Sequence, residues 1–198
     1  MLILASGSPR RKEMFDRLRL SYRVVTSGAD ETVEEPLAPA ELVKTLAARK
    51  AGAAAPFSRE EDVIVAADTV VAMKNKIYGK PKDAAEAHAM LAAFSGRTHQ
   101  VYTGFAIRRA MKCHTESVVT QVTFRPLTDR EIDRYIEEEK PFDKAGAYGI
   151  QEGAGIFVLS IEGSFDNVVG LPLTQLELAL KREFSLSLFD FEAVGKRF

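Results

Sequence analysis

A short turn near the amino terminus has residue types that bind phosphate. Residues 6–8 read Ser-Gly-Ser after an apolar run, and Ser8-Pro9 is a typical helix start, with serine as N-cap and proline at the first helical position. A strand, turn and helix in this order direct backbone N–H groups and a positive helix end at one point. Arg10 and Arg11 stand in the first turn, where a helix disfavours cations unless an anion binds beside them. The turn predicts an anion site; the alternative is a solvated basic turn that starts an ordinary helix.

A second chemical signal is the carboxylate of Asp68, which follows the apolar run 63–67. In α/β sheets the end of such a strand presents functional groups to a crevice. A carboxylate placed there needs cations, a metal or backbone donors as partners, because burying it alone is costly. The alternative is that Asp68 and Thr69 cap a turn, but residues 70–71 resume an apolar strand and offer no helix to cap.

Two lysines and a second carboxylate complete the candidate site. Lys50 ends a predicted helix, where the dipole favours a cation for structural reasons alone. Lys80 stands in a rigid Gly-Lys-Pro turn and, like Arg11, is expected to be exposed. With the two arginines, these lysines supply the charge that would neutralise a triphosphate. Glu31 and Asp68 are candidate ligands for a divalent cation, since hard oxygen donors suit Mg²⁺ or Mn²⁺.

Other reactive side chains favour structural interpretations. His99 begins a predicted strand in a polar turn, which favours a hydrogen-bonding role over that of a general base. Cys113 is the single cysteine, so it forms no internal disulfide; beside His114 in a strand-like run, it favours a structural role over a metal or catalytic dyad. We find no Walker-type loop, no dinucleotide fingerprint and no Ser–His–acid pattern.

The composition limits the class of protein. The chain has 198 residues, and its 27 basic and 28 acidic residues give a net charge of −1, so no overall basic field exists to hold a nucleic acid polymer. A hydrophobic fraction of 46% is typical of globular proteins. No apolar run reaches the length of a membrane span, and no signal sequence precedes the first strand. We therefore expect a cytoplasmic protein without a membrane partner.

Helical and strand patterns alternate along the chain, which predicts an α/β fold with a mixed sheet. Strands are predicted at residues 2–5, 22–26, 63–67, 70–73, 77–78, 101–107, 118–124 and 156–161. Helices are predicted at residues 9–18, 39–55, 83–94, 128–139 and 172–184, with capping boxes in the third and fourth. Between them we expect a turn with two carboxylates at 27–31, a hairpin turn at 74–76, an ordered functional loop at 143–151 and an apolar turn at 167–171.

Seven motifs over roughly residues 2–184 occur in the order found in the Maf family, which this chain resembles. They are Ser6-Gly-Ser-Pro-Arg-Arg11, Lys50-Ala51, Ala67-Asp-Thr69, Gly79-Lys-Pro81, Ser95-Gly-x-x-His99, the loop 143–151 and Asn167-Val-Val-Gly-Leu-Pro172. The resemblance implies a single α/β domain over 1–184, with a mixed β-sheet and flanking helices in two lobes around a deep cleft, similar to inosine triphosphate pyrophosphatase. Members of the family are often dimeric, so the resemblance also implies a homodimer as a partner state of this chain. Residues 185–198 match no motif and are expected to be a C-terminal tail.

The same resemblance implies an activity and a role for each matched position. The activity is cleavage of a nucleoside triphosphate between its α and β phosphates, which releases a nucleoside monophosphate and pyrophosphate. Asp68 matches the proton acceptor. The phosphate-side positions are matched by Ser6, Arg11, Lys50 and Lys80. Glu31 matches an acidic metal-site position, although the spacing of residues 28–31 is loosely defined in the family. Base specificity is implied for Arg10, Thr69 and Gln151.

Within the family, this chain resembles the branch that acts on dTTP and UTP. That branch has threonine after the key aspartate and a Tyr-Gly-Ile-Gln loop, as at Thr69 and residues 148–151. The branch that acts on 7-methyl-GTP typically has glutamine after the aspartate, so 7-methyl-GTP is the alternative substrate. A different class of alternative is a nucleotide-binding inhibitor of septum formation without turnover, but the intact Asp68 and lysines argue against it.

Overall fold

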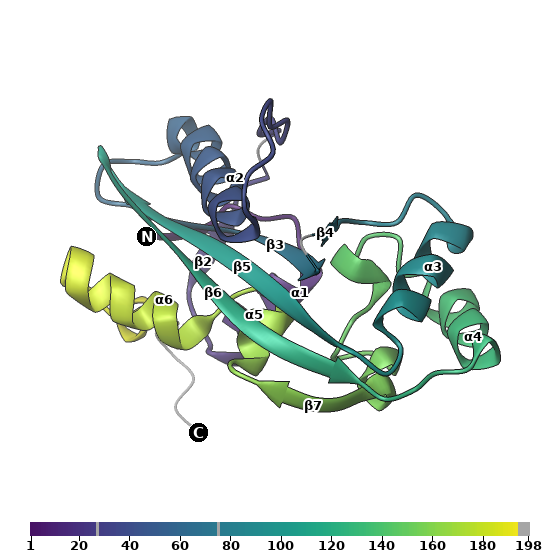
Figure 1. Ribbon diagram of the computed structural model, residues 1–198. Coiled ribbons are helices and arrows are strands. Elements are labelled where there is room, and N and C mark those ends of the chain that lie inside the picture. The colour runs from purple at the N-terminus through teal and green to yellow at the C-terminus, as the bar shows by residue number, and fades with distance from the viewer. Residues whose placement is uncertain (27, 75, 194–198) are drawn as a thin grey trace, which may run out of the picture. The chain divides into compact units, whose positions relative to one another are not determined.

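The computed structural model describes residues 1–26, 28–74 and 76–193 (Figure 1). The strands are β1 (Leu2–Leu4), β2 (Tyr22–Val24), β3 (Val63–Met73), β4 (Lys76–Tyr78), β5 (Thr98–Arg109), β6 (Lys112–Phe124) and β7 (Val158–Glu162). The α-helices are α1 (Pro9–Arg17), α2 (Pro39–Ala54), α3 (Ala84–Phe94), α4 (Asp129–Glu139), α5 (Phe165–Val169) and α6 (Leu173–Ala179). A π-helical turn, Leu180–Phe184, continues α6, and 3-10 turns lie at Ala55–Phe57, Ala145–Ala147, Gly153–Phe157 and Leu188–Phe191.

The strands form a mixed sheet in the order β2-β1-β3-β5-β6-β7, with β4 paired to β3. β1 runs parallel to β2 and β3, whereas β4 runs antiparallel to β3 and β7 runs antiparallel to β6. This confirms the predicted fold class, an α/β protein with a mixed sheet and flanking helices. No helix in the described part of the chain is both long and apolar enough to cross a bilayer.

The chain divides into two compact units. The first comprises Met1–Asp68, Thr103–Val118 and the described residues from Gly170 onward. The second comprises Thr69–Tyr102 and Val119–Val169.

In the first unit, α2 packs closely on the sheet through small residues. Ala47, Ala51 and Ala54 are buried in one cluster with β1, β3 and β5. Gly104 in β5 makes this approach possible, because a Cβ built there would lie 2.4 Å from the carbonyl carbon and oxygen of Val43. The glycine therefore fixes how near α2, the helix that carries Lys50, lies to the strands.

The second unit is organised around an aromatic core. Phe94 of α3, Phe124 of β6 and Tyr148 pack edge to face, and the His99 ring stacks on Phe94 at a centroid distance of 4.4 Å. The His99 Nε2 atom lies 2.9 Å from the Tyr148 hydroxyl. His99 is 1% exposed. This environment agrees with the structural role expected for His99.

Burial of His99 makes a prediction for acid stability. Burial lowers the pKa of His99 to about 4, whereas an unfolded histidine titrates near ~6.5. The unfolded chain therefore binds a proton that the folded chain does not, and stability falls as the pH drops between these values. We expect the unfolding free energy to fall by about 2 kcal/mol between pH 7 and pH 5 on account of His99 alone. Urea unfolding of wild type and His99→Gln checks this: equal losses in the two proteins would contradict it.

Two sequence predictions at strands and turns are wrong. β3 does not stop before Asp68 but runs unbroken to Met73, because Asp68 and Thr69 keep extended backbone although only partly buried. The apolar turn predicted at 167–171 is mostly helix, since α5 spans Phe165–Val169. Asn167 connects this helix to β5, because its buried side-chain amide donates to the Val101 carbonyl at 3.0 Å. The hairpin of β3 and β4 is confirmed, although Asn75 in its turn lies outside the described residues.

Helix starts follow the predictions only in part. At α4 the capping box is confirmed, since Thr128 and Glu131 bond reciprocally. At α3 the Asp83 side chain caps the helix, but Glu86 accepts from the backbone N–H of Lys82 instead, so that box is incomplete. Ser8 takes the N-cap position of α1 without a side-chain capping bond.

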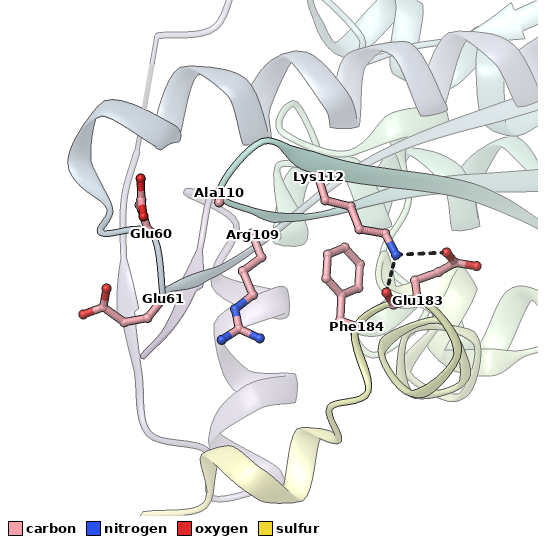
Figure 2. Close-up of a pocket in the computed structure, with 7 residues that line it drawn as sticks. All are labelled: Glu60, Glu61, Arg109, Ala110, Lys112, Glu183 and Phe184. Atoms are coloured by element: carbon pink, nitrogen blue, oxygen red, sulfur yellow. Dashed lines mark hydrogen bonds and ion pairs between the residues drawn. The ribbon is translucent and has the colours of Figure 1, made fainter.

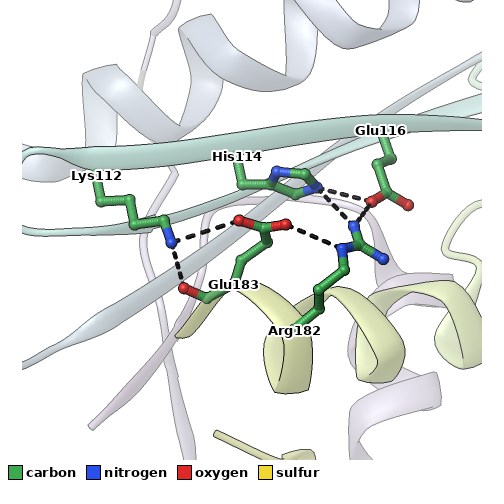
Figure 3. Close-up of polar contacts among 5 residues, drawn as sticks. All are labelled: Lys112, His114, Glu116, Arg182 and Glu183. Atoms are coloured by element: carbon green, nitrogen blue, oxygen red, sulfur yellow. Dashed lines mark hydrogen bonds and ion pairs between the residues drawn. The ribbon is translucent and has the colours of Figure 1, made fainter. Parts of the chain in front are cut away.

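The segment after α6 has structure that the sequence pattern did not predict. The side chain of Leu188 is buried. The Ser21 N–H donates to the Phe191 carbonyl, and Leu20 forms an isolated antiparallel β-bridge with Glu192. Side chains also tie β6 to this end of the chain: Arg182 contacts Glu116, which lies 2.8 Å from His114, and Lys112 contacts Glu183 (Figure 3). Of the expected tail, residues 194–198 lie outside the described part.

Candidate functional site

The predicted phosphate turn is built around a buried serine. Ser6 follows β1 and is 8% exposed. Its Oγ accepts a bond from the Ser8 N–H at 3.2 Å and another from Arg11 Nη1 at 3.2 Å. The Nε–H of Arg11 donates to the Gly170 carbonyl at 2.7 Å. The guanidinium is thus oriented by two protein groups at the start of α1.

This geometry corrects the expectation that Arg11 is exposed. Its side chain is partly buried, and burial lowers the pKa of Arg11 to about 10, opposed by the attraction of Asp68. Arg11 remains a cation at neutral pH, with Arg10 near enough to repel it. Replacing Arg11 would therefore remove structural bonds as well as charge, so its effect on activity would not isolate a role in binding.

The ammonium of Lys50 lies between the two predicted acidic residues. Its Nζ is 2.5 Å from Asp68 Oδ1 and 3.0 Å from Glu31 Oε1. The Lys50 and Asp68 side chains are 17% and 13% exposed, whereas Glu31 is 58% exposed. Lys50 stands near the end of α2 and Asp68 stands in β3, so the packing of α2 on the sheet brings them together.

The side chain of Arg49 in α2 holds the backbone of the segment that carries Glu31. Arg49 donates to the carbonyl of Asp30 at 3.2 Å and to that of Thr32 at 2.5 Å. The Thr32 N–H donates to Asp30 Oδ1 at 2.9 Å, which closes a tight turn around Glu31. Ser27, in the predicted acidic turn, lies outside the described residues. The sequence showed the two carboxylates here but gave no sign of the arginine that positions them.

The donor set fits a divalent cation that also binds phosphate. One ammonium touches both Glu31 and Asp68, so a single positive centre can reach both carboxylates. Among the residues described, no group of three or more His, Cys, Asp or Glu side chains gathers to hold a metal. Mg²⁺ is usually held by one or two carboxylates plus substrate phosphates rather than by an all-protein cage. Two carboxylates suit that arrangement.

In the second unit, the Gly-Lys-Pro turn is fixed through its backbone. The Gly146 N–H donates to the Gly79 carbonyl at 2.9 Å, and Pro81 is buried. Gly146 has a φ of +70°, and a Cβ there would lie 2.8 Å from Val71 Cγ2, so only glycine suits this contact. Lys80 itself is exposed, as the sequence predicted.

Exposure makes Lys80 a clean test of anion binding. We expect Lys80→Ala to lower kcat/KM for a triphosphate by roughly 10- to 100-fold, the loss of one charge-assisted bond to an ionised group. Unfolding free energy should change by less than about 0.5 kcal/mol, as for most surface substitutions. Steady-state kinetics and urea unfolding measure the two effects. Lys82→Ala, an exposed lysine two residues away, is the control; equal kinetics in both variants would remove Lys80 from the site.

Gln151 is exposed on a turn whose neighbours are tightly held. The Glu152 N–H donates to the Gly149 carbonyl at 3.1 Å, and the Gly149 N–H donates to the Tyr135 hydroxyl at 3.1 Å. Lys144, 7% exposed, pairs with Asp143 at 2.9 Å and with Glu152 at 3.1 Å. The sequence marked this loop as functional but assigned no role to Lys144 or Glu152.

The predicted site residues therefore fall into two sets. Those that lie in the first unit are Ser6, Arg10, Arg11, Glu31, Lys50 and Asp68. Those in the second unit are Thr69, Lys80 and Gln151, and Thr69 follows Asp68 directly in β3. The Gly170 carbonyl, which accepts the bond from Arg11, lies 159 residues away in the sequence. The sequence near Arg11 therefore could not predict this contact.

A separate hollow in the first unit is unsuited to a triphosphate. It has a volume of about 550 Å³, and Figure 2 shows Glu60, Glu61 and Glu183 around it with Arg109 and Lys112. Lys112 is 3.4 Å from Glu183, so one of the two cations is already paired. Three carboxylates would repel a polyanion, and this hollow is not the candidate site.

The fold and the site define an α/β protein in which the side chains of Lys50 and Arg11 lie near the carboxylate of Asp68. The family model described as Maf-like protein matches residues 1–183. A dTTP/UTP pyrophosphatase of Bacillus cytotoxicus is 48% identical over 180 residues, 91% of this chain and 94% of the relative. One of Bacillus cereus is 44% identical over 181 residues, with the same two shares. The chain belongs to the Maf-like family, as its motifs predicted.

Among solved structures, the Ham1 protein of Staphylococcus aureus gives a TM-score of 0.45 at 16% identity, covering 62% of this chain and 71% of that one.

Proposed function

We propose that this protein hydrolyses dTTP and UTP to the nucleoside monophosphate and pyrophosphate. The observation that carries the proposal is the contact of Lys50 with Asp68 and Glu31, beside an arginine oriented by Ser6. Such a cluster offers a candidate base, cations and two candidate metal ligands, which supports the proposal. The names of relatives 44–48% identical over 91% of the chain support the two substrates.

In the proposed mechanism Asp68 accepts the proton of the attacking water. The oxygen of that water bonds to the α- or the β-phosphorus in line with the oxygen that bridges them, the bond from that phosphorus to the bridging oxygen breaks, and the product that keeps the bridging oxygen departs with the electron pair. Lys50 donates to Asp68 and fixes the carboxylate. Arg11, Lys50 and Lys80 would stabilise the negative charge that develops on the phosphate oxygens. Glu31 and Asp68 would hold a divalent cation, Mg²⁺ or Mn²⁺, whose chemistry is to neutralise phosphate oxygens.

Base selection is assigned to Arg10, Thr69 and Gln151 by the family resemblance. The amide of Gln151 both donates and accepts, which suits the O4 and N3–H edge of uracil and thymine. Cytosine presents an amine and an unprotonated N3 there, and a polar site left unpaired rejects the wrong base strongly. An extra methyl group is discriminated weakly, so dTTP and UTP should both be substrates.

Gln151→Ala tests this assignment. We expect wild type to prefer dTTP and UTP over CTP and 7-methyl-GTP, and the variant to narrow the dTTP:CTP ratio of kcat/KM by up to about 100-fold, the cost of leaving one polar group unpaired. Steady-state kinetics on the four nucleotides measure this. A wild-type preference for 7-methyl-GTP, or ratios unchanged by the substitution, would overturn the proposal.

The remaining expectations are part of the same proposal. The substrate is a free nucleotide rather than a nucleic acid polymer, and the proposed compartment is the cytoplasm. The homodimer implied by the family resemblance is tested by light scattering on the purified protein.

A further inference from the structure

The structure contains a buried lysine, paired with two carboxylates, that the mechanism above does not use. Lys144 is 7% exposed, although lysine is rarely buried unless its charge is compensated. Its Nζ lies 2.9 Å from Asp143 Oδ1 and 3.1 Å from Glu152 Oε2. The two carboxylates lie at different places in the chain. Asp143 is the residue before Lys144, whereas Glu152 lies eight positions after Lys144 and directly follows Gln151 in the loop.

The pair packs directly against the backbone of that loop. A Cβ built on Gly149 would lie 2.7 Å from Glu152 Oε2 and 3.0 Å from Lys144 Cε, so the two side chains fill the space beside this glycine. The Gly149 N–H is fixed by the Tyr135 hydroxyl at 3.1 Å, and its carbonyl accepts from the Glu152 N–H at 3.1 Å. Residues 149 and 152 therefore have fixed positions on both sides of the turn.

Gln151 sits inside this turn, and its own side chain is exposed. Burial of the amide cannot hold it, so the backbone of 149–152 determines where it lies. We propose that Lys144 is a positioning residue for base selection: its ion pair with Glu152 sets the turn that presents Gln151 to the pyrimidine. The inference rests on the proposed function and extends it to a residue pair that does not touch the base.

The test is selectivity rather than activity alone. We expect Lys144→Met to lower the dTTP:CTP ratio of kcat/KM by about tenfold, because a displaced amide reads the base edge less well. Lys144→Arg keeps the charge and should restore part of the ratio. Glu152→Gln should lower it in the same direction while leaving Lys144 its bond to Asp143, so this variant decides the question if Lys144→Met does not fold. Arg134→Gln, which breaks the exposed pair with Glu138, is the control and should leave the ratio unchanged.

A double substitution separates this inference from the proposed function. In a Gln151→Ala protein, Lys144→Met should lower the dTTP:CTP ratio no further, because the two residues act through one amide. A further fall by the full factor, or an unchanged ratio in both Lys144→Met and Glu152→Gln, would overturn the positioning role. If instead wild type shows no preference for dTTP over CTP, or Gln151→Ala alone leaves that preference intact, the proposed base reading itself fails.

Discussion

Asp68→Asn should reduce dTTP turnover by about 100-fold or more while nucleotide binding persists, because loss of a general base typically costs at least that factor. Asparagine keeps the size of the side chain and an oxygen that accepts from Lys50, whose Nζ lies 2.5 Å from Asp68 Oδ1. It cannot take a proton from water. The folded structure should survive, since the partly buried position loses a charge but no bulk.

The measurement pairs steady-state kinetics with direct binding of a non-hydrolysable dTTP analogue. We expect kcat to fall while the dissociation constant of the analogue changes by less than about tenfold, the worth of one uncharged hydrogen bond at most, because asparagine keeps the oxygen that accepts from Lys50. Near-normal turnover in Asp68→Asn would remove this residue from the chemical step. Loss of binding with kcat retained would make Asp68 a binding residue instead of a base.

The second large effect is expected at Lys50. Lys50→Met removes an ammonium that contacts both Asp68 and Glu31, so these carboxylates lose this shared counter-charge. Because the same ammonium also stabilises negative charge on phosphate in the proposed mechanism, we expect kcat/KM for dTTP to fall by roughly 100-fold. Lys50→Arg restores the charge and should recover part of the activity.

Lys44→Met is the matched control for this prediction. Lys44 is on the same helix, α2, and pairs with Glu41 at 2.8 Å, three residues away. Kinetics and urea unfolding of both variants separate chemistry from folding. If the two substitutions change kcat/KM equally, or if Lys50→Met only lowers stability, Lys50 is a helix-end cation without a role in turnover.

Much of the fold was predictable from local patterns. The apolar runs gave β1 and the buried part of β3, and the capping box at Thr128 fixed the start of α4. The pattern failed where polar residues interrupt an element, as at Asp68 within β3, or where an element is very short, as in α5. The place of β3 between β1 and β5 in the sheet and the bond from Asn167 belong to the tertiary structure, and neither is visible in a window of sequence.

The candidate site was predictable as a set of residue types but not as a set of contacts. Lys50 pairs with Asp68 because α2 packs on the sheet. The close packing requires glycine at position 104, and the local sequence around Gly104 does not show this requirement. The exposure expected for Arg11 was wrong: its guanidinium is partly buried and donates to the Gly170 carbonyl, which is distant in sequence. Lys144 looked like one charge in a polar loop, and only the fold shows that it is buried.

The proposed hydrolysis is tested by following dTTP through the reaction in ¹⁸O-labelled water with Mg²⁺. We expect dTMP and pyrophosphate as the products, with one labelled oxygen on whichever of the two contains the attacked phosphorus. With Asp68→Asn, labelled product should form at no more than about 1% of the wild-type rate. Release of dTDP and inorganic phosphate, or tight dTTP binding by wild type without any labelled product, would contradict it.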